Sequence, residues 1–179
     1  MAAPVSVPIS HKARHADDKP QLADEGRVAQ ILSLNKTSLI ADWLARVKQT
    51  PELSHLHLRD DERIGHLSKL VDDIVVRLAK PNLPTQDSDA PASPAAVEHG
   101  RLRRTQGYSS AMLIHESRIL QVTIFGTLHK NVSQLDFSAL LPDVMTIADE
   151  VDSQLTQTME SFTNAPLKSA KTHLVKAKG

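Results

Sequence analysis

Hydrogen-bond donors gather on one short stretch of the chain, residues 98–121. His99, Arg103 and Gln106 are spaced i, i+4 and i+7, so a helix places these three side chains on one face. Three donor-rich side chains in one row could hold an anion or a carboxylate. The alternative is an ordinary solvated face, because polar helix faces usually contact water.

Arg118 lies in a strongly apolar part of the sequence, where a buried guanidinium needs a partner. Glu116 is only two residues away and would point elsewhere on a helix, so Glu98 on another helix is the better predicted partner. The alternative is that the aliphatic part of the Arg118 side chain packs against the bundle while its guanidinium reaches solvent at the rim. Gly107 predicts the turn that ends a helix, and Tyr108 after it is expected to pack between helices with its hydroxyl hydrogen-bonded.

Motifs for catalysis are absent from the sequence. It contains no glycine-rich phosphate loop, no G-x-S-x-G nucleophile elbow and no kinase catalytic motif. A nucleophile, a base and a residue that orients the base cannot be assembled in one neighbourhood. We therefore expect no enzymatic activity and no catalytic residue.

Histidine spacing argues against a metal site. The chain has nine histidines and no cysteine, so only His, Asp and Glu could bind a metal. His115 and His129 are 14 residues apart, about 21 Å along a helix, and cannot share one ion. We expect no metal and no cofactor. A haem bound through His99 or His115 is the alternative, because a helical fold can host one.

Charge and hydropathy exclude several classes of protein. The 179 residues include 21 Lys and Arg against 21 Asp and Glu, whereas a protein that binds duplex nucleic acid needs a positive field. A polybasic membrane contact would also need excess basic residues. No apolar run approaches the roughly 18 residues of a membrane span, and the first 20 residues lack the apolar stretch of a signal peptide. We therefore expect a cytoplasmic protein that binds neither nucleic acid nor membranes.

Apolar spacing predicts an all-α fold, a helical bundle of four to five main helices without strands. A capping residue and a proline at the first helical position are expected at Ser93 and Pro94, and Ser109 or Ser110 is expected to cap the next helix. The fourth helix is apolar on almost every side, which is typical of a helix at the centre of a bundle. The five predicted helices cover residues 23–50 (interrupted at 35–38), 60–80, 93–106, 111–129 and 141–162.

Composition also predicts the domain boundaries. Residues 1–22 read as a disordered N-terminal tail, because prolines and scattered charges occur there without periodicity. A helical domain is expected over residues 23–162, with a proline-rich linker at 81–94 within it. Residues 163–179 are expected to be a flexible basic tail.

The stretch of residues 99–121 resembles the signature of the RsbRD-type N-terminal domain, named for a family of RsbT co-antagonist proteins. Domains of this kind also precede catalytic regions in bacterial sensor histidine kinases. The flanking helices resemble the same domain, so the resemblance covers about residues 25–162. Its motif consists of His99, Gly100, Arg103, Gln106, Gly107, Tyr108, Leu113, Glu116 and Arg118.

This resemblance implies an all-helical sensory or regulatory input domain that passes its output to a signalling partner or to a linked kinase module. It implies no reaction and no established ligand. No anti-sigma-antagonist or kinase module follows the fifth predicted helix in this sequence. The chain is therefore expected to be either a free-standing version of the domain or one excised from a longer protein.

Our leading hypothesis is a cytoplasmic input domain of a bacterial signalling pathway of the histidine kinase or stressosome type. A signal would change the packing of the helices, and the fifth helix would carry that change out. One alternative is a protein that binds haem or another small ligand between the third and fourth helices. Another is a homodimeric interaction module that uses the 64–78 or 144–162 apolar stripe as its seam. The candidate signal-binding residues are His99, Arg103, Gln106, Tyr108, His115, Glu116 and Arg118.

Overall fold

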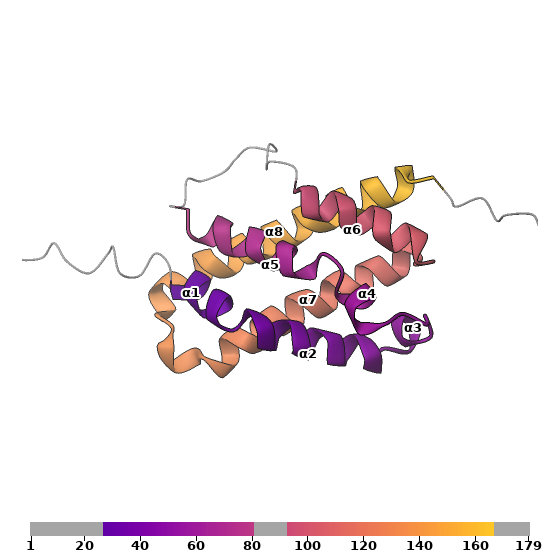
Figure 1. Ribbon diagram of the computed structural model, residues 1–179. Helices are drawn as coiled ribbons and strands as arrows, with labels where there is room; N and C mark the ends of the chain where they lie inside the picture. The colour runs from indigo at the N-terminus through magenta and orange to yellow at the C-terminus, as the bar shows by residue number, and fades with distance from the viewer. Residues whose placement is uncertain (1–26, 81–92, 167–179) are drawn as a thin grey trace, which may run out of the picture.

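The computed structural model describes residues 27–80 and 93–166, and these residues form helices and no strands (Figure 1). The predicted all-α class is thereby confirmed. Five of the helices have 12 or more residues, in agreement with a bundle of four to five main helices. The elements are α1 (Arg27–Leu34), α2 (Lys36–Gln49), α3 (Pro51–Ser54), α4 (Asp60–Ile64), α5 (Leu67–Leu78), α6 (Pro94–Thr105), α7 (Ser110–Lys130), a 3-10 turn (Val132–Gln134) and α8 (Phe137–Asn164).

One predicted segment and most of two others lie outside the described residues. They are the N-terminal tail, residues 81–92 of the linker and residues 167–179 of the C-terminal tail. The C-terminal tail was predicted to begin at residue 163, but α8 continues to Asn164. At its other end α8 begins at Phe137, one turn before the predicted start, because the Asp136 side chain accepts a hydrogen bond from the backbone N–H of Ser138.

Local capping signals position the helices that carry the polar residues. The Ser93 hydroxyl accepts a hydrogen bond from the backbone N–H of Ala96 at 3.1 Å, and Pro94 occupies the first helical position of α6. Gly107 has a φ of 85°, which ends α6, and Ser109 caps α7 through the N–H of Met112. These predicted boundaries are confirmed.

The predicted continuous helix over residues 60–80 is wrong, because Gly65 divides it into α4 and α5. Gly65 has a φ of 48°, which no helix can contain. By contrast, the interruption predicted after residue 34 is confirmed. Asn35 turns the chain between α1 and α2 and donates a side-chain hydrogen bond to the Ile31 carbonyl at 2.8 Å.

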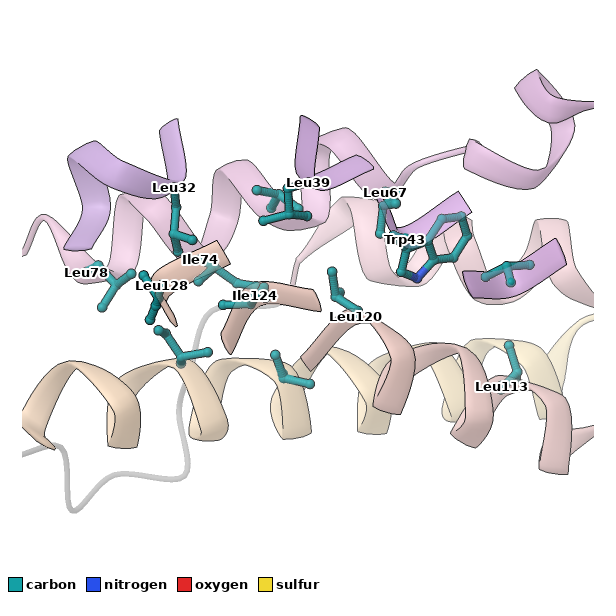
Figure 2. Packing of buried hydrophobic residues seen from close by; sticks show 14 of the residues in the cluster. Leu32, Leu39, Trp43, Leu67, Ile74, Leu78, Leu113, Leu120, Ile124 and Leu128 are labelled. Atoms are coloured by element: carbon teal, nitrogen blue, oxygen red, sulfur yellow. The ribbon is translucent and has the colours of Figure 1, made fainter. Parts of the chain in front are cut away.

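The long helices enclose one hydrophobic core. The most extensive helix-to-helix contact joins α6 to α8, while α1 lies against α5 and α2 lies against α7 (Figure 1). Figure 2 shows aliphatic side chains from several helices packed in a row along the bundle, with the single tryptophan, Trp43, toward one end of that row. Its labelled residues are Leu32, Leu39, Trp43, Leu67, Ile74, Leu78, Leu113, Leu120, Ile124 and Leu128.

The fourth predicted helix, α7, is not surrounded on all sides as expected. Leu113, Leu120 and Ile124 are buried, but Ile114 and Val122 on the other side are about half exposed. The reason is that the described helices pack against one side of α7 and leave the other without a cover. Among the described residues, no helix is both long and apolar enough to cross a membrane.

Both stripes proposed as a dimer seam are used inside the chain. Leu67, Val71 and Ile74 of α5 are buried in the core, as are Ile147 and Val151 of α8. The α5 stripe is therefore not free to contact a second copy, whereas Val144, Ala148 and Leu155 of the predicted α8 stripe are only partly buried. The largest exposed apolar side chains of α8 lie on its other face.

Candidate functional site

Arg103 is completely buried, and each of its five N–H groups has an acceptor. Its Nε donates to Glu116 Oε2 at 3.0 Å, and one Nη2 hydrogen is directed at Glu116 Oε1 at 2.5 Å, so the pair is bidentate. Nη1 donates to the Glu62 carbonyl at 3.1 Å and to Gln106 Oε1 at 2.7 Å. The remaining Nη2 hydrogen bonds to the Arg63 carbonyl. This guanidinium therefore joins α4, α6 and α7.

Glu116 is the acceptor at the centre of the site. Besides Arg103, its carboxylate contacts His99 Nε2 at 3.1 Å and the Tyr108 hydroxyl at 3.5 Å, and all four side chains are buried. The Arg103 guanidinium also lies over the Tyr108 ring, 4.8 Å from its centroid. We call these four residues the Arg103–Glu116 cluster.

The cluster keeps Glu116 ionised. Burial acts to raise the pKa of this carboxyl group, but the positive charge of Arg103 and the contact with His99 outweigh it and hold the pKa below the ordinary value. An ionised carboxylate can only accept hydrogen bonds, so His99 Nε2 must carry the hydrogen that it shares with Glu116. In the neutral ring, Nδ1 of His99 is then an acceptor.

The end of α4 and a glycine in α6 position the Arg103–Glu116 cluster. The carbonyls of Glu62 and Arg63 belong to the last turn of α4, which ends at Gly65, and helix C-termini attract cations. Gly100 permits the close approach of α6 to α8, because a Cβ there would lie 2.2 Å from the Thr158 carbonyl oxygen. Both glycines therefore help to set the position of Arg103.

A second buried arginine supports the neighbouring turn. Arg63 donates to the carbonyls of Leu53 at 3.0 Å, Ser54 at 3.3 Å and Leu56. It thereby satisfies backbone acceptors at the end of the four-residue helix α3. The nearby His66 has a lowered pKa, first because of burial and then because of His99 and Lys69. Arg63 was not among the predicted site residues, and the three acidic residues directly before it in the sequence gave no sign that it would be buried.

A cavity of about 30 Å³ adjoins the cluster in the middle of the bundle. That space is enough for one or two water-sized molecules. His99 and Gln154 both line this cavity, and the buried atoms His99 Nδ1 and Gln154 Oε1 have no hydrogen-bond partner among the described residues. The cavity lining is Trp43, Leu67, Leu70, His99, Leu113, Glu116, Ser117, Leu120, Val151, Gln154, Leu155 and Thr158.

The structure unites five of the seven predicted site residues and separates two. Four of them, His99, Arg103, Tyr108 and Glu116, form the cluster, and Gln106 bonds to Arg103 and to the Glu62 carbonyl at 3.0 Å. The carboxylate that the donor side chains of α6 could hold is therefore Glu116 of the same chain. The residues left outside are His115 and Arg118.

His115 and Arg118 are exposed, so their assignment to the site was wrong. Both lie on the side of α7 that faces away from the core, whereas Glu116 shares the buried side with Leu113 and Leu120. The predicted partner of Arg118, Glu98, instead pairs with Arg101 at the surface at 2.7 Å. Gln154 was not among the predicted site residues. Its spacing of i+3 from Val151, on the apolar stripe of the fifth predicted helix, was a signal that its polar side chain would be buried.

The alternative of a bound haem fits this site poorly. His99 is already bonded to Glu116, His115 is exposed, and the cavity is far smaller than a porphyrin. Within residues 27–80 and 93–166, no group of three or more His, Asp or Glu side chains is placed to hold a metal ion.

Ionisation of Tyr108 should destabilise the protein at alkaline pH. Burial, followed by the negative charge of Glu116, raises the pKa of Tyr108 from 10.0 to about 12. A folded-state pKa above the unfolded value contributes stability that is complete below pH 10 and is lost as the pH rises through 12. Because Tyr108 is the only tyrosine, the ultraviolet absorbance of phenolate reports it alone.

We expect a Tyr108→Phe variant to lose less stability than the wild type between pH 10 and 12, by about 2–3 kcal/mol at the upper end. Urea unfolding at several pH values measures the difference. Parallel stability curves for the two proteins, or phenolate formation near pH 10 in the folded protein, would contradict this prediction.

Comparison with family models, with curated proteins and with solved structures produced no match to this chain.

Proposed function

We propose that this chain is a non-catalytic regulatory input domain of a cytoplasmic signalling pathway, of the histidine kinase or stressosome type. A signal acts at the Arg103–Glu116 cluster, and α8 passes the change to a partner protein or to a linked kinase module. The observation that supports this proposal is a buried charge cluster beside a cavity, with two buried polar atoms of the cavity-lining residues that have no partner among the described residues.

A buried charge cluster is a costly way to stabilise a fold. The free-energy cost of removing two charges from water offsets most of the attraction between them. Well-packed apolar residues in the same place often stabilise a core equally well or better. Such a cluster is better suited to holding one arrangement of helices against another. Arg103 bonds to the end of α4 and to α7, while its own helix packs closely on α8, so a disturbance at the cluster acts on several helices.

The polar atoms of the cavity-lining residues suggest which chemistry a signal molecule would need. His99 Nδ1 and Gln154 Oε1 both act as acceptors when His99 is neutral. A small molecule that donates two hydrogen bonds would satisfy both atoms. Such a molecule would link α6, which carries His99, to α8, which carries Gln154.

Hydrogen exchange on the purified protein tests whether the cluster is coupled to α8. The variant is His99→Gln, which can still donate a hydrogen bond to Glu116. The matched control is Arg118→Gln on the exposed side of α7. We expect several-fold faster or slower amide exchange over residues 137–147 of α8 in His99→Gln, because the altered contact shifts the packing of α6 on α8. These residues lie at least seven positions before Gln154, the nearest cavity residue with an unpartnered atom.

Two results would contradict the proposal. One is a change in exchange that is confined to residues in contact with position 99. The other is an equal change over all helices, which would mean that the cluster only stabilises the fold. The control is expected to match the wild type throughout.

A further inference from the structure

The outer face of α8 carries the longest row of exposed apolar side chains among the described residues. Phe137, Leu141 and Met145 are 69%, 67% and 65% exposed. They are spaced i, i+4 and i+8, so they form one row about 12 Å long. We call this row the α8 stripe. The neighbouring side of α8 packs into the core through Ile147 and Val151.

Exposed negative charge follows the α8 stripe in the later turns of the helix. Asp149 and Asp152 lie on the next turns, and Glu160 follows further along. All three are exposed. Arg77 of α5 contacts Asp149, whereas Asp152 and Glu160 form no ion pair within the described part of the chain. The helix as a whole contains five carboxylates and no lysine or arginine.

We propose that the outer face of α8 is a docking surface for a basic amphipathic helix of a partner protein. The apolar side of such a helix would cover Phe137, Leu141 and Met145, and its lysine or arginine residues would meet Asp152 and Glu160. Methionine and aromatic side chains are common anchors for a helix in this mode of recognition. The surface goes beyond the proposed function, because it does not depend on the Arg103–Glu116 cluster.

The negative charge of α8 determines which kind of partner fits this surface. A second copy of α8 would offer an apolar row, but also five carboxylates and no cation to complement those of the first. Nucleic acids and anionic lipid surfaces would be repelled by the same negative charge. A basic helix supplies both the apolar cover and the opposite charge.

A direct binding experiment uses the full chain and a synthetic peptide of leucine and lysine, with leucine at i, i+3, i+4 and i+7 and lysine elsewhere. A second peptide replaces every lysine with glutamate. Isothermal calorimetry measures the affinity of both peptides for the wild type and for three variants. The variants are Leu141→Asp in the stripe, the charge reversal Asp152→Lys with Glu160→Lys, and Ile114→Asp as the matched control on an exposed apolar position of α7.

We expect the lysine peptide to bind the wild type and Ile114→Asp equally, and to bind the other two variants at least about tenfold more weakly. The glutamate peptide should not bind the wild type. Equal affinity of the lysine peptide for wild type and Leu141→Asp would overturn the proposal. So would a wild-type dimer in light scattering that Leu141→Asp converts to a monomer, because a second copy would then occupy the surface.

Measurements on the His99→Gln variant distinguish failure of the docking surface from failure of the proposed function. If the lysine peptide binds the wild type as expected but His99→Gln leaves hydrogen exchange over residues 137–147 unchanged, the docking surface stands and the proposed coupling of the cluster to α8 fails. If Leu141→Asp retains the wild-type affinity while His99→Gln still alters exchange in α8, the docking surface fails and the coupling stands.

Discussion

Replacement of Glu116 with glutamine is expected to lower the free energy of unfolding by about 3–5 kcal/mol, the usual cost of breaking a buried ion pair by removing one charge. Arg103 would remain completely buried with no carboxylate to balance its charge. Because the two side chains have nearly the same shape, the loss reports charge and hydrogen bonding rather than a cavity. Urea unfolding followed by the fluorescence of Trp43, the single tryptophan, measures it.

Glu98→Gln is the matched control for this variant. Glu98 forms an exposed ion pair with Arg101, so the same chemical change should cost less than about 1 kcal/mol. Equal losses for the two variants would show that the Arg103–Glu116 pair has no special role in stability. In a second comparison, Arg103→Met together with Glu116→Leu should be less destabilised than either single variant, because no unpaired charge remains.

The effect of Glu116→Gln should also depend on pH. The pKa of Glu116 in the folded protein lies below its ordinary value of 4.5, despite the opposing effect of burial. A depressed pKa contributes stability that is present above the unfolded value and is lost as the pH falls through the folded value. The difference in stability between wild type and variant should therefore shrink on acidification, as measured by unfolding at successively lower pH.

Substitution of Gly100 by alanine should have the second large effect. The added Cβ would lie 2.1 Å from the Ser161 hydroxyl oxygen and 2.2 Å from the Thr158 carbonyl oxygen. The Ser161 side chain can rotate, but the carbonyl belongs to the backbone of α8, so α6 and α8 must separate. We expect a loss of about 3 kcal/mol or more in the free energy of unfolding, measured by urea denaturation.

Gly126→Ala is the control for Gly100→Ala. Gly126 lies within α7, and a Cβ there would have no neighbour within 4 Å. Alanine is the better helix former, so this variant should be about 0.5–1 kcal/mol more stable than the wild type. A stable Gly100→Ala variant would mean that the contact between α6 and α8 tolerates separation. The close approach of these helices would then not position the cluster.

Several features of the fold were predictable because their causes are local. The Ser93 cap with Pro94 marks the start of α6, and Gly107 followed by Ser109 marks the turn into α7. Each signal depends on backbone hydrogen bonds within a few residues. The break at Gly65 escaped prediction because the apolar spacing continues through it from Ile64 to Leu67, and spacing alone does not reveal a left-handed residue.

The candidate site was predictable only in part, for a related reason. Helical spacing correctly placed His99, Arg103 and Gln106 on one face of α6, but it could not identify their acceptor. The face of α7 that is buried had to be known first, and this helix is apolar on both sides. The sequence therefore left two predictions open for Arg118, a buried side chain with a partner or one at the rim of the bundle, and the structure has Arg118 exposed while Glu116 is buried.

By itself the sequence determined an all-α fold, its main helices and the cluster of polar residues on α6 and α7, because helix periodicity and capping are properties of neighbouring residues. Only the tertiary structure decided which carboxylate balances Arg103 and that backbone carbonyls of α4 complete its bonding. It also decided that Gln154 reaches the cavity and that the α8 stripe is left uncovered. These outcomes depend on which helix faces meet. That pairing is determined by contacts between residues far apart in the chain, such as Glu62, Arg103 and Gln154, which local sequence patterns do not specify.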